Sequence, residues 1–359
     1  MTSVPRPLCR CSRDLDRLDV LDVCALLLET FGFIANLTVT LILFLLRAKK
    51  IESLALLRVL SLSCLAATFV DFLSDVAARS SNTGNAFFDG LVCVLWSSRF
   101  IFWYSKAHVY HSLFFFACNR AFEMLQIKNY PMTTQKQRLT AYMLLVFICS
   151  FLSTAPQLLL VQPHVKNCAC APPTRNLVIL TMIYAHTFLW VAILAVIYPA
   201  ILVYICIALV LRARRSEGNA LVDELDQLYF PNSLTSSPSS STTATSASSP
   251  LTHTIPCDGE RRSAATRYDD SEPRIWSASF CLIPLSVTYI VTFSYDATYQ
   301  FLSATGTITY MLRSPRQQFG EILLILFTAL VPLIIFFHVP AMRSLIFVAI
   351  AALQKRCCK

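Results

Sequence analysis

Residues 319–340 read FGEILLILFTALVPLIIFFHVP, a mostly apolar run with Pro332 inside it. Seven such runs follow one another along the 359 residues, and the sixth also contains a proline, in Cys281-Leu282-Ile283-Pro284. The runs cover residues 21–46, 54–78, 91–118, 139–161, 184–211, 275–302 and 319–340. Each reaches the ~20 residues that a helix needs to cross a bilayer, so we expect seven spans.

The composition indicates a membrane protein rather than one with a large soluble core. Hydrophobic residues make up 55% of the chain and charged residues 14%, whereas soluble domains carry about 25% charged residues. The runs lack the alternation of a membrane β-barrel, and backbone groups in lipid must be satisfied internally. We therefore predict an all-α membrane protein, a seven-transmembrane helix bundle with spans 1–5 in residues 21–211 and spans 6–7 in residues 275–340.

The distribution of Lys and Arg predicts the orientation. Four arginines precede the first run, which is too long for the core of a signal peptide, so we expect no cleavable signal. With the N-terminus outside, nineteen basic residues fall on the cytosolic side and nine on the other. We predict a plasma-membrane protein with residues 1–20 extracellular and a cytosolic C-terminus.

The connection 212–274 differs from the rest of the chain. Thirteen of the eighteen residues from Ser233 to Pro250 are Ser or Thr, which bury too little apolar surface to offset chain entropy. We predict a disordered third cytosolic loop. It is at least a tether, and its hydroxyls make a kinase and an arrestin candidate partners.

Five cysteines fall on the predicted oxidising side, and the spacing of two of them, Cys9 and Cys11, indicates no particular pairing. Cys93 opens span 3, and Cys168 and Cys170 precede span 5. A bridge from Cys93 to Cys168 or Cys170 is expected, with simple burial of unpaired thiols as the alternative.

Motifs in the spans resemble those of rhodopsin-like G protein-coupled receptors. Gly32 to Val39, with Asn36, is similar to the family's first-span signature, and Asp71 resembles its second-span aspartate. The 35 residues between Asn36 and Asp71 are several more than the family usually has. Cys118-Asn119-Arg120-Ala121 keeps only the arginine of the family's acidic-Arg-aromatic triplet. Cys281-Leu282-Ile283-Pro284 and Val331-Pro332-Leu333-Ile334-Ile335 replace Cys-Trp-x-Pro and Asn-Pro-x-x-Tyr.

The resemblance implies a switch role for six residues. They are Asn36, Asp71, Arg120, Pro199, Pro284 and Pro332. We expect the prolines to kink spans 5, 6 and 7, because proline removes a backbone donor and clashes with the preceding turn. For Arg120 the resemblance implies contact with a G protein. Since Asn119 replaces the acidic neighbour, we expect no closing salt bridge and a looser resting state.

Asp71 and Lys106 are charges at mid-membrane depth, about 20 Å from the cytosolic face at ~1.5 Å per residue. An isolated ion there is costly, so we hypothesise an Asp71–Lys106 ion pair between spans 2 and 3. The alternative is that Lys106 faces a cavity and attracts an anionic ligand group.

Polar and aromatic residues nearer the outside are candidates for a ligand cleft, although packing or an interfacial belt also explains the aromatics. With Lys106, the candidate ligand-binding residues are Arg99, Trp103, His186, Trp190, Tyr289, Phe293, Asp296 and Glu321. His108 and His111 lie at i, i+3, but no matching ligands stand on another span, so we predict hydrogen-bonded structural histidines and no metal or cofactor.

The segment 341–359 begins with thirteen residues that are mostly apolar, too short to span, and predicts an interfacial helix. Cys357 and Cys358, among Lys and Arg, are typical of S-palmitoylation, with two reduced thiols as the alternative.

The resemblance implies a cell-surface receptor that binds an extracellular peptide or small molecule and signals through a heterotrimeric G protein. The alternative is a seven-span chemoreceptor-like or orphan protein without standard coupling, and a transporter is a third hypothesis. We expect no enzyme activity, no catalytic residues and no nucleic-acid partner.

Overall fold

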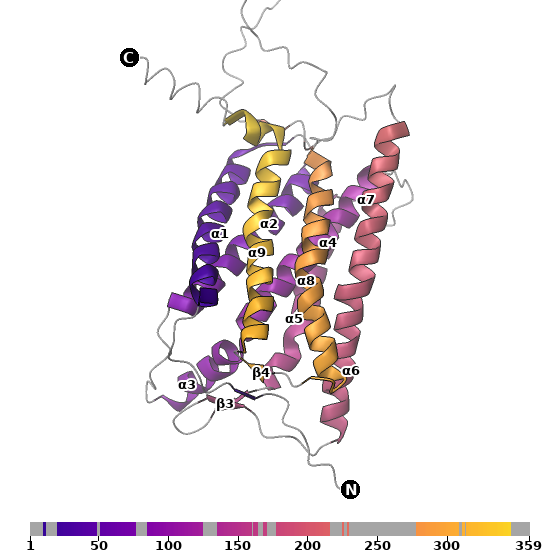
Figure 1. Ribbon diagram of the computed structural model, residues 1–359. Helices are drawn as coiled ribbons and strands as arrows, with labels where there is room; N and C mark the ends of the chain where they lie inside the picture. The colour runs from indigo at the N-terminus through magenta and orange to yellow at the C-terminus, as the bar shows by residue number, and fades with distance from the viewer. Residues whose placement is uncertain are drawn as a thin grey trace, which may run out of the picture.

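The computed structural model is a bundle of helices that stand side by side (Figure 1). It describes residues 10–11, 20–48, 51–76, 85–124, 135–159, 161–163, 168–170, 177–215, 225, 228–229, 278–308, 311–312 and 314–345.

Long helices, some interrupted by a short 3-10 or π-helical turn, build the bundle. In chain order they are α1 (Val20–Leu45), α2 (Ile51–Val76), α3 (Ala86–Val92), the π-helical η1 (Cys93–Ser97), α4 (Phe100–Met124), α5 (Gln135–Thr154), the 3-10 turn η2 (Ala155–Leu159), α6 (Leu177–Ala192), the π-helical η3 (Ile193–Ile197), α7 (Tyr198–Arg215), the 3-10 turn η7 (Ala278–Cys281), α8 (Leu282–Ala304) and α9 (Pro315–His338). α6, η3 and α7 follow one another without a break.

Four short strands pair in the connections at one end of the bundle. β1 (Arg10–Cys11) runs parallel to β4 (Met311–Leu312). β2 (Val161–Pro163) is antiparallel to β3 (Cys168–Cys170), with Gln162 opposite Ala169.

Six helical segments of the described chain are long and apolar enough to cross a membrane, and a seventh results if α3 with η1 and α4 count as one bent span. The prediction is therefore confirmed for six spans. The third, predicted over 91–118, is bent by 41° between Trp96 and Phe100. Arg99, inside this break, has φ of 60°, a left-handed conformation that an α-helix of L-residues does not accommodate.

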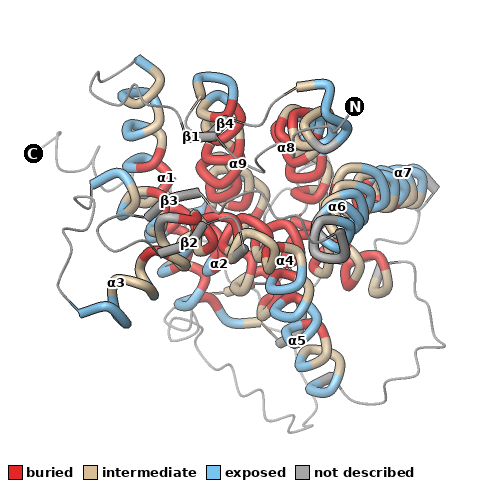
Figure 2. Tube along the Cα trace, turned by 90° about the horizontal axis from the view of Figure 1, so that it is seen from below, coloured by how far each residue is buried: buried red, intermediate tan, exposed pale blue. Residues whose placement is uncertain are grey.

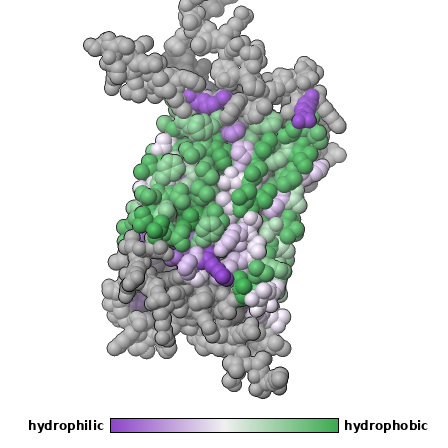
Figure 3. Space-filling view, viewed as in Figure 1, coloured by the Kyte–Doolittle hydropathy of each residue, from purple (hydrophilic) through white to green (hydrophobic). Residues whose placement is uncertain are grey.

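The outer faces of the helices are apolar (Figure 3). Figure 2 shows exposed residues along α5 and along the α6–α7 flank, where Phe147, Leu189 and Val196 are more than half exposed. Only 22% of the apolar window in Lys136–Leu158 is buried within the protein. Exposed apolar surface on this scale requires lipid around it, so the chain is a multi-pass membrane protein.

Close approach of α1, α2 and α9 depends on Gly32. A Cβ at this position would lie 3.2 Å from both the Ala329 Cβ and the Thr68 Cγ2. A small residue at a crossing lets helices pack tightly in a membrane, where dispersion replaces the hydrophobic effect between them.

The predicted connections are described only in part. Of residues 216–277 the structure describes Leu225, Leu228 and Tyr229, and these three pack against the bundle rather than being disordered as predicted. The predicted interfacial helix is described only to residue 345, where residues 340–345 are helical. Cys357 and Cys358 lie outside the described residues.

Candidate functional site

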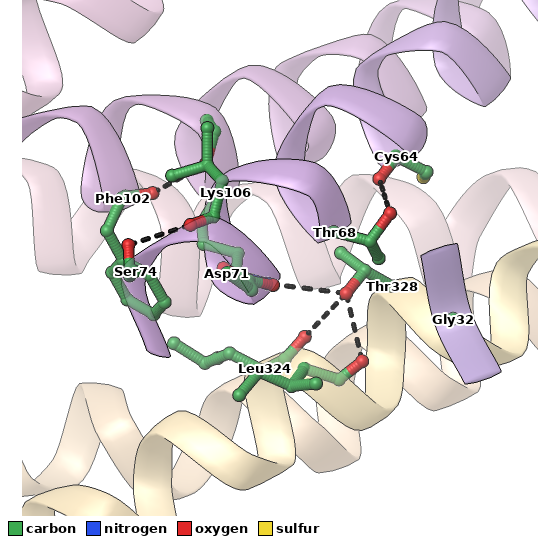
Figure 4. A network of polar contacts seen from close by, with 12 residues as sticks. Gly32, Cys64, Thr68, Asp71, Ser74, Phe102, Lys106, Leu324 and Thr328 are labelled. Carbon is green, nitrogen blue, oxygen red and sulfur yellow. Dashed lines mark hydrogen bonds and ion pairs between the residues drawn. The ribbon is translucent and has the colours of Figure 1, made fainter. Parts of the chain in front are cut away.

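A buried ion pair joins α2 to α4. The Lys106 Nζ donates to Asp71 Oδ2 at 2.5 Å, and both side chains are 0% exposed. The same ammonium donates to Thr328 Oγ1 of α9 at 3.3 Å. Figure 4 shows these residues converging from three helices. The hypothesised Asp71–Lys106 pair is thus present, and it ties α2, α4 and α9 together at mid-bundle.

Asn36 and Asp71 lie at different depths. The Asn36 amide donates to the carbonyl oxygens of Gly32 at 2.9 Å and Thr328 at 3.0 Å, which links α1 to α9. Gly32 faces Thr68, and the Thr40 and Ser61 hydroxyls are 2.7 Å apart. In this antiparallel register Asn36 stands level with the turn of α2 around Cys64. Asp71 is therefore nearly two turns further along α2, which accounts for the long 35-residue separation.

A cavity of about 90 Å³ lies between α4, the α5–η2 end, α6 with η3, and α8. Its lining is aromatic and polar, and Lys106 is the one Lys, Arg, Asp or Glu among the lining residues. Five predicted ligand-binding residues line it, and they are Trp103, Lys106, His186, Trp190 and Phe293. Lys106 thus belongs both to the ion pair and to the cavity lining, and its attraction of an anionic ligand group stays a prediction.

Sequence reasoning missed several lining residues. Tyr110 continues the stripe of Trp103, Lys106 and Ala107 on α4 at helical spacing, so periodicity would have found it. Its hydroxyl is buried without a hydrogen-bond partner in the described part of the chain. Gln300 lies seven residues after Phe293 on the same face of α8. The other missed residues come from the end of span 4 and from span 5, where no pattern singled them out: Ser153, Thr154, Pro156, Gln157, Thr187, Val191 and Leu194.

The remaining predicted ligand residues do not line this cavity. Arg99 forms an ion pair with Glu321 and lies over the Phe102 ring, 4.6 Å from its centroid. Glu321 also accepts from Gln317 Nε2 at 3.0 Å. The charges expected to meet a ligand are thus engaged with other side chains of the bundle.

Asp296 is linked to the cavity only indirectly. It is buried, and its carboxylate accepts from Gln300 Nε2 at 2.7 Å, so Gln300 connects it to the lining. Asp296 is therefore connected to the cavity lining through Gln300 and does not itself belong to it.

An aromatic cluster borders the cavity on its buried side. Tyr110 contacts Tyr289, Phe293 and Phe327 with ring centroids 5.1, 5.2 and 5.7 Å apart. Tyr289 is buried, and its hydroxyl donates to the Leu194 carbonyl oxygen at 2.5 Å. Tyr289 is therefore part of this packed support rather than of the lining.

Arg120 lies near the far end of α4 and bonds to the 3-10 turn η7, which precedes α8. Its Nε donates to the Ser279 Oγ at 3.1 Å, and its guanidinium forms an ion pair with Glu123 one turn later. Glu123 also accepts from Asn119 Nδ2 at 2.9 Å. Residue 119 offers no acid to Arg120, as expected, but Glu123 on the following turn supplies one that the sequence analysis did not consider. The looser resting state inferred from that absence loses its basis.

The three prolines differ in position. Pro332 is inside α9, and Pro199 is the second residue of α7, directly after the π-helical η3. Pro284 is the third residue of α8, next to the 3-10 turn that carries Ser279. All three prolines thus lie within spans 5, 6 and 7, and the kinks expected at them stay a prediction.

The two histidines of α4 are hydrogen-bonded, as predicted. His111 Nδ1 is 2.8 Å from the Tyr198 hydroxyl, and His108 Nδ1 is 3.3 Å from Ser150 Oγ. Across the described segments, no group of three or more His, Cys, Asp or Glu residues is placed to hold a metal ion.

Cys93 is disulfide-bonded. The β2–β3 hairpin that contains Cys168 and Cys170 has its first strand packed against η1, which begins at Cys93. The side chains of Cys168 and Cys170 lie outside the described part, so the identity of the partner stays a prediction.

Fold and contacts together define a multi-span helical membrane protein with a cavity toward one end and an arginine bonded between helices at the other. A scan against models of known protein families finds no match, and no curated protein matches the sequence closely enough to count as a relative.

Proposed function

We propose that this chain is a divergent rhodopsin-like receptor of the plasma membrane, with its N-terminus outside. An extracellular ligand binds in the cavity lined by Trp103, Trp190 and Phe293, and a heterotrimeric G protein binds at the end that carries Arg120. The Ser/Thr-rich loop is the proposed site for a kinase and an arrestin.

The observation that carries this proposal is the position of both sites on one helix. Trp103 to Tyr110 line the cavity, and Arg120 lies at the other end of α4, about 20 Å from Lys106 at ~1.5 Å per residue. The same helix contacts α2, α5 and α7. A ligand that shifts α4 relative to α8 therefore also strains the Arg120–Ser279 hydrogen bond.

The mechanism is a population shift. The described conformation has Arg120 bonded to Ser279, and a conformation with this bond broken frees the guanidinium. A ligand that binds the second conformation more tightly raises the population of that conformation. The ratio of its affinities for the two conformations sets the size of the shift.

The alternative is a receptor-like protein without standard coupling. Val331 and Ile335 on α9 are fully buried and apolar where the resemblance has Asn and Tyr, which favours this alternative because apolar packing offers no polar switch. The two are separated by recruitment of a panel of G proteins to the surface-expressed chain, with a pool of secreted peptides and metabolites as ligand source. Silence of the whole panel despite surface expression would refute coupling.

A further inference from the structure

A short piece of the long connection between α7 and α8 is part of the bundle core. Leu225 is 1% exposed and Leu228 is 7% exposed, and both belong to the main cluster of buried apolar residues. Burial of the two leucines removes apolar surface from water, so this contact stabilises the described arrangement.

The backbone next to these leucines is also fixed. Arg47, in the turn between α1 and α2, and Tyr229 exchange both hydrogen bonds of an antiparallel bridge: the Arg47 amide donates to the Tyr229 carbonyl oxygen at 3.0 Å, and the Tyr229 amide donates back at 3.2 Å. α7 ends at Arg215, and Figures 1 and 2 place α7 and α1 on opposite flanks of the bundle. The chain thus leaves one flank and is bonded to the other by Tyr229.

The end of the bundle that receives this segment is the end with Arg120. α1 ends there, α2 and α8 begin there, and α4 and α9 end there. Its central residues are buried, with Arg120 and Val339 1% exposed and Ala278 and Met342 0% exposed. This end of the bundle is therefore closed at its centre in this conformation, and Leu225 and Leu228 belong to the same buried cluster as Val339 and Met342.

We propose that Leu225, Leu228 and Tyr229 occupy, within the same chain, the surface to which a cytosolic transducer binds. The sequence around the leucines is acidic, with Asp223, Glu224 and Asp226, whereas the receiving end carries Arg47, Arg58, Arg138 and Arg343. The competing partner is accordingly a segment that presents leucines next to acidic residues. The inference rests on the proposed function, because it assigns the covered surface to the G protein.

A disulfide across the bridge tests docking without reference to signalling. Residues that exchange both hydrogen bonds in an antiparallel pair have Cα atoms about 5.5 Å apart, within disulfide range. R47C/Y229C in the full chain, with a protease site inserted at residues 216–220, should give two fragments that stay joined after oxidation and cleavage and separate on reduction. R47C/S237C is the control for random collision in the same connection. Cross-linking no greater than in this control would overturn the proposal.

The functional arm compares recruitment of G proteins without agonist. Locked R47C/Y229C should recruit about tenfold less than the same protein after reduction, and L225D/L228D about tenfold more than the unaltered chain. L234D/L251D, which places the same charges elsewhere in the connection, should leave recruitment unchanged. An N-terminal epitope corrects each value for surface expression, and L225A/L228A replaces the aspartate variant if the latter does not reach the surface.

The outcomes separate the two proposals. A cross-link that forms without changing recruitment overturns the competition while leaving G-protein coupling intact. A cross-link that forms while every G protein is silent in both redox states overturns the proposed coupling, and the competition with it. Cross-linking together with reversible suppression supports both.

Discussion

Replacement of Lys106 by methionine gives the most direct test of the mid-bundle arrangement. The ammonium and the Asp71 carboxylate are both inaccessible, and the Nζ is 2.5 Å from Oδ2. The other carboxylate oxygen, Oδ1, has no hydrogen-bond partner among the described residues, so the ammonium is the one donor seen on this carboxylate. K106M therefore leaves a buried charge without compensation.

The cost follows from these contacts. Two unit charges at 4 Å attract by about 4 kcal/mol at the effective dielectric of a protein, and removal of one partner from a buried pair typically costs about 3–5 kcal/mol. We expect K106M to lose that amount of folding free energy, and D71L/K106M to recover most of it, because an apolar pair of similar volume leaves no unpaired charge.

The assay is the melting temperature of the detergent-solubilised protein, followed by size-exclusion fluorescence, together with surface expression. K136M removes an exposed lysine at the start of α5 and is the matched control, with no expected loss. A K106M variant that melts with the wild type, or a double variant no better than the single one, would refute the assignment of the pair as a structural tie.

Three further predictions concern separate parts of the bundle. Gly32→Leu should lower the melting temperature by overpacking worth about 1–3 kcal/mol, because its Cβ meets two side chains at 3.2 Å, whereas Gly90→Leu, with nothing within 4 Å, should not. Ser279→Ala removes the acceptor that η7 offers to Arg120 and should raise recruitment of G proteins without agonist about tenfold or more, because a hydrogen bond to a charged group contributes about 1.5–3 kcal/mol; unchanged recruitment would argue against a closing role. Phe293→Ala, in the cavity lining, should weaken ligand potency about tenfold or more, whereas Val291→Ala, on the exposed face two residues away, should not; equal effects in dose-response curves would place the ligand elsewhere.

Hydropathy predicted most of the fold because lipid requires every span to be an apolar helix of about 20 residues. Predicted ends differ from the helix ends by a few residues for the first two spans, and the Asp71–Lys106 pair followed from counting residues from the cytosolic face. A helix rises by a constant amount per residue, and a lone charge at that depth needs a partner. The prediction of the spans and the prediction of the ion pair use only the geometry of a helix and the apolar character of the lipid.

Sequence reasoning missed features that depend on tertiary contacts, and it missed a residue that lies outside the motif position under inspection. The left-handed Arg99 that breaks the third span is held by its ion pair and its aromatic neighbour, and nothing local in the sequence signals it. Glu123 was missed as the partner of Arg120 because the motif directs attention to the preceding residue.

The π-helical turn η3 fixes the rotation of everything that follows it in the fifth span. Directly after it, Tyr198 stacks on Phe114 with ring centroids 3.8 Å apart and lies within hydrogen-bonding distance of His111. Successive residues of an α-helix are turned by about 100°, so loss of one residue from the wide turn would swing Tyr198 away from both partners and turn a different face of α7 toward the bundle. The residue count of this span is therefore as strictly constrained as its composition.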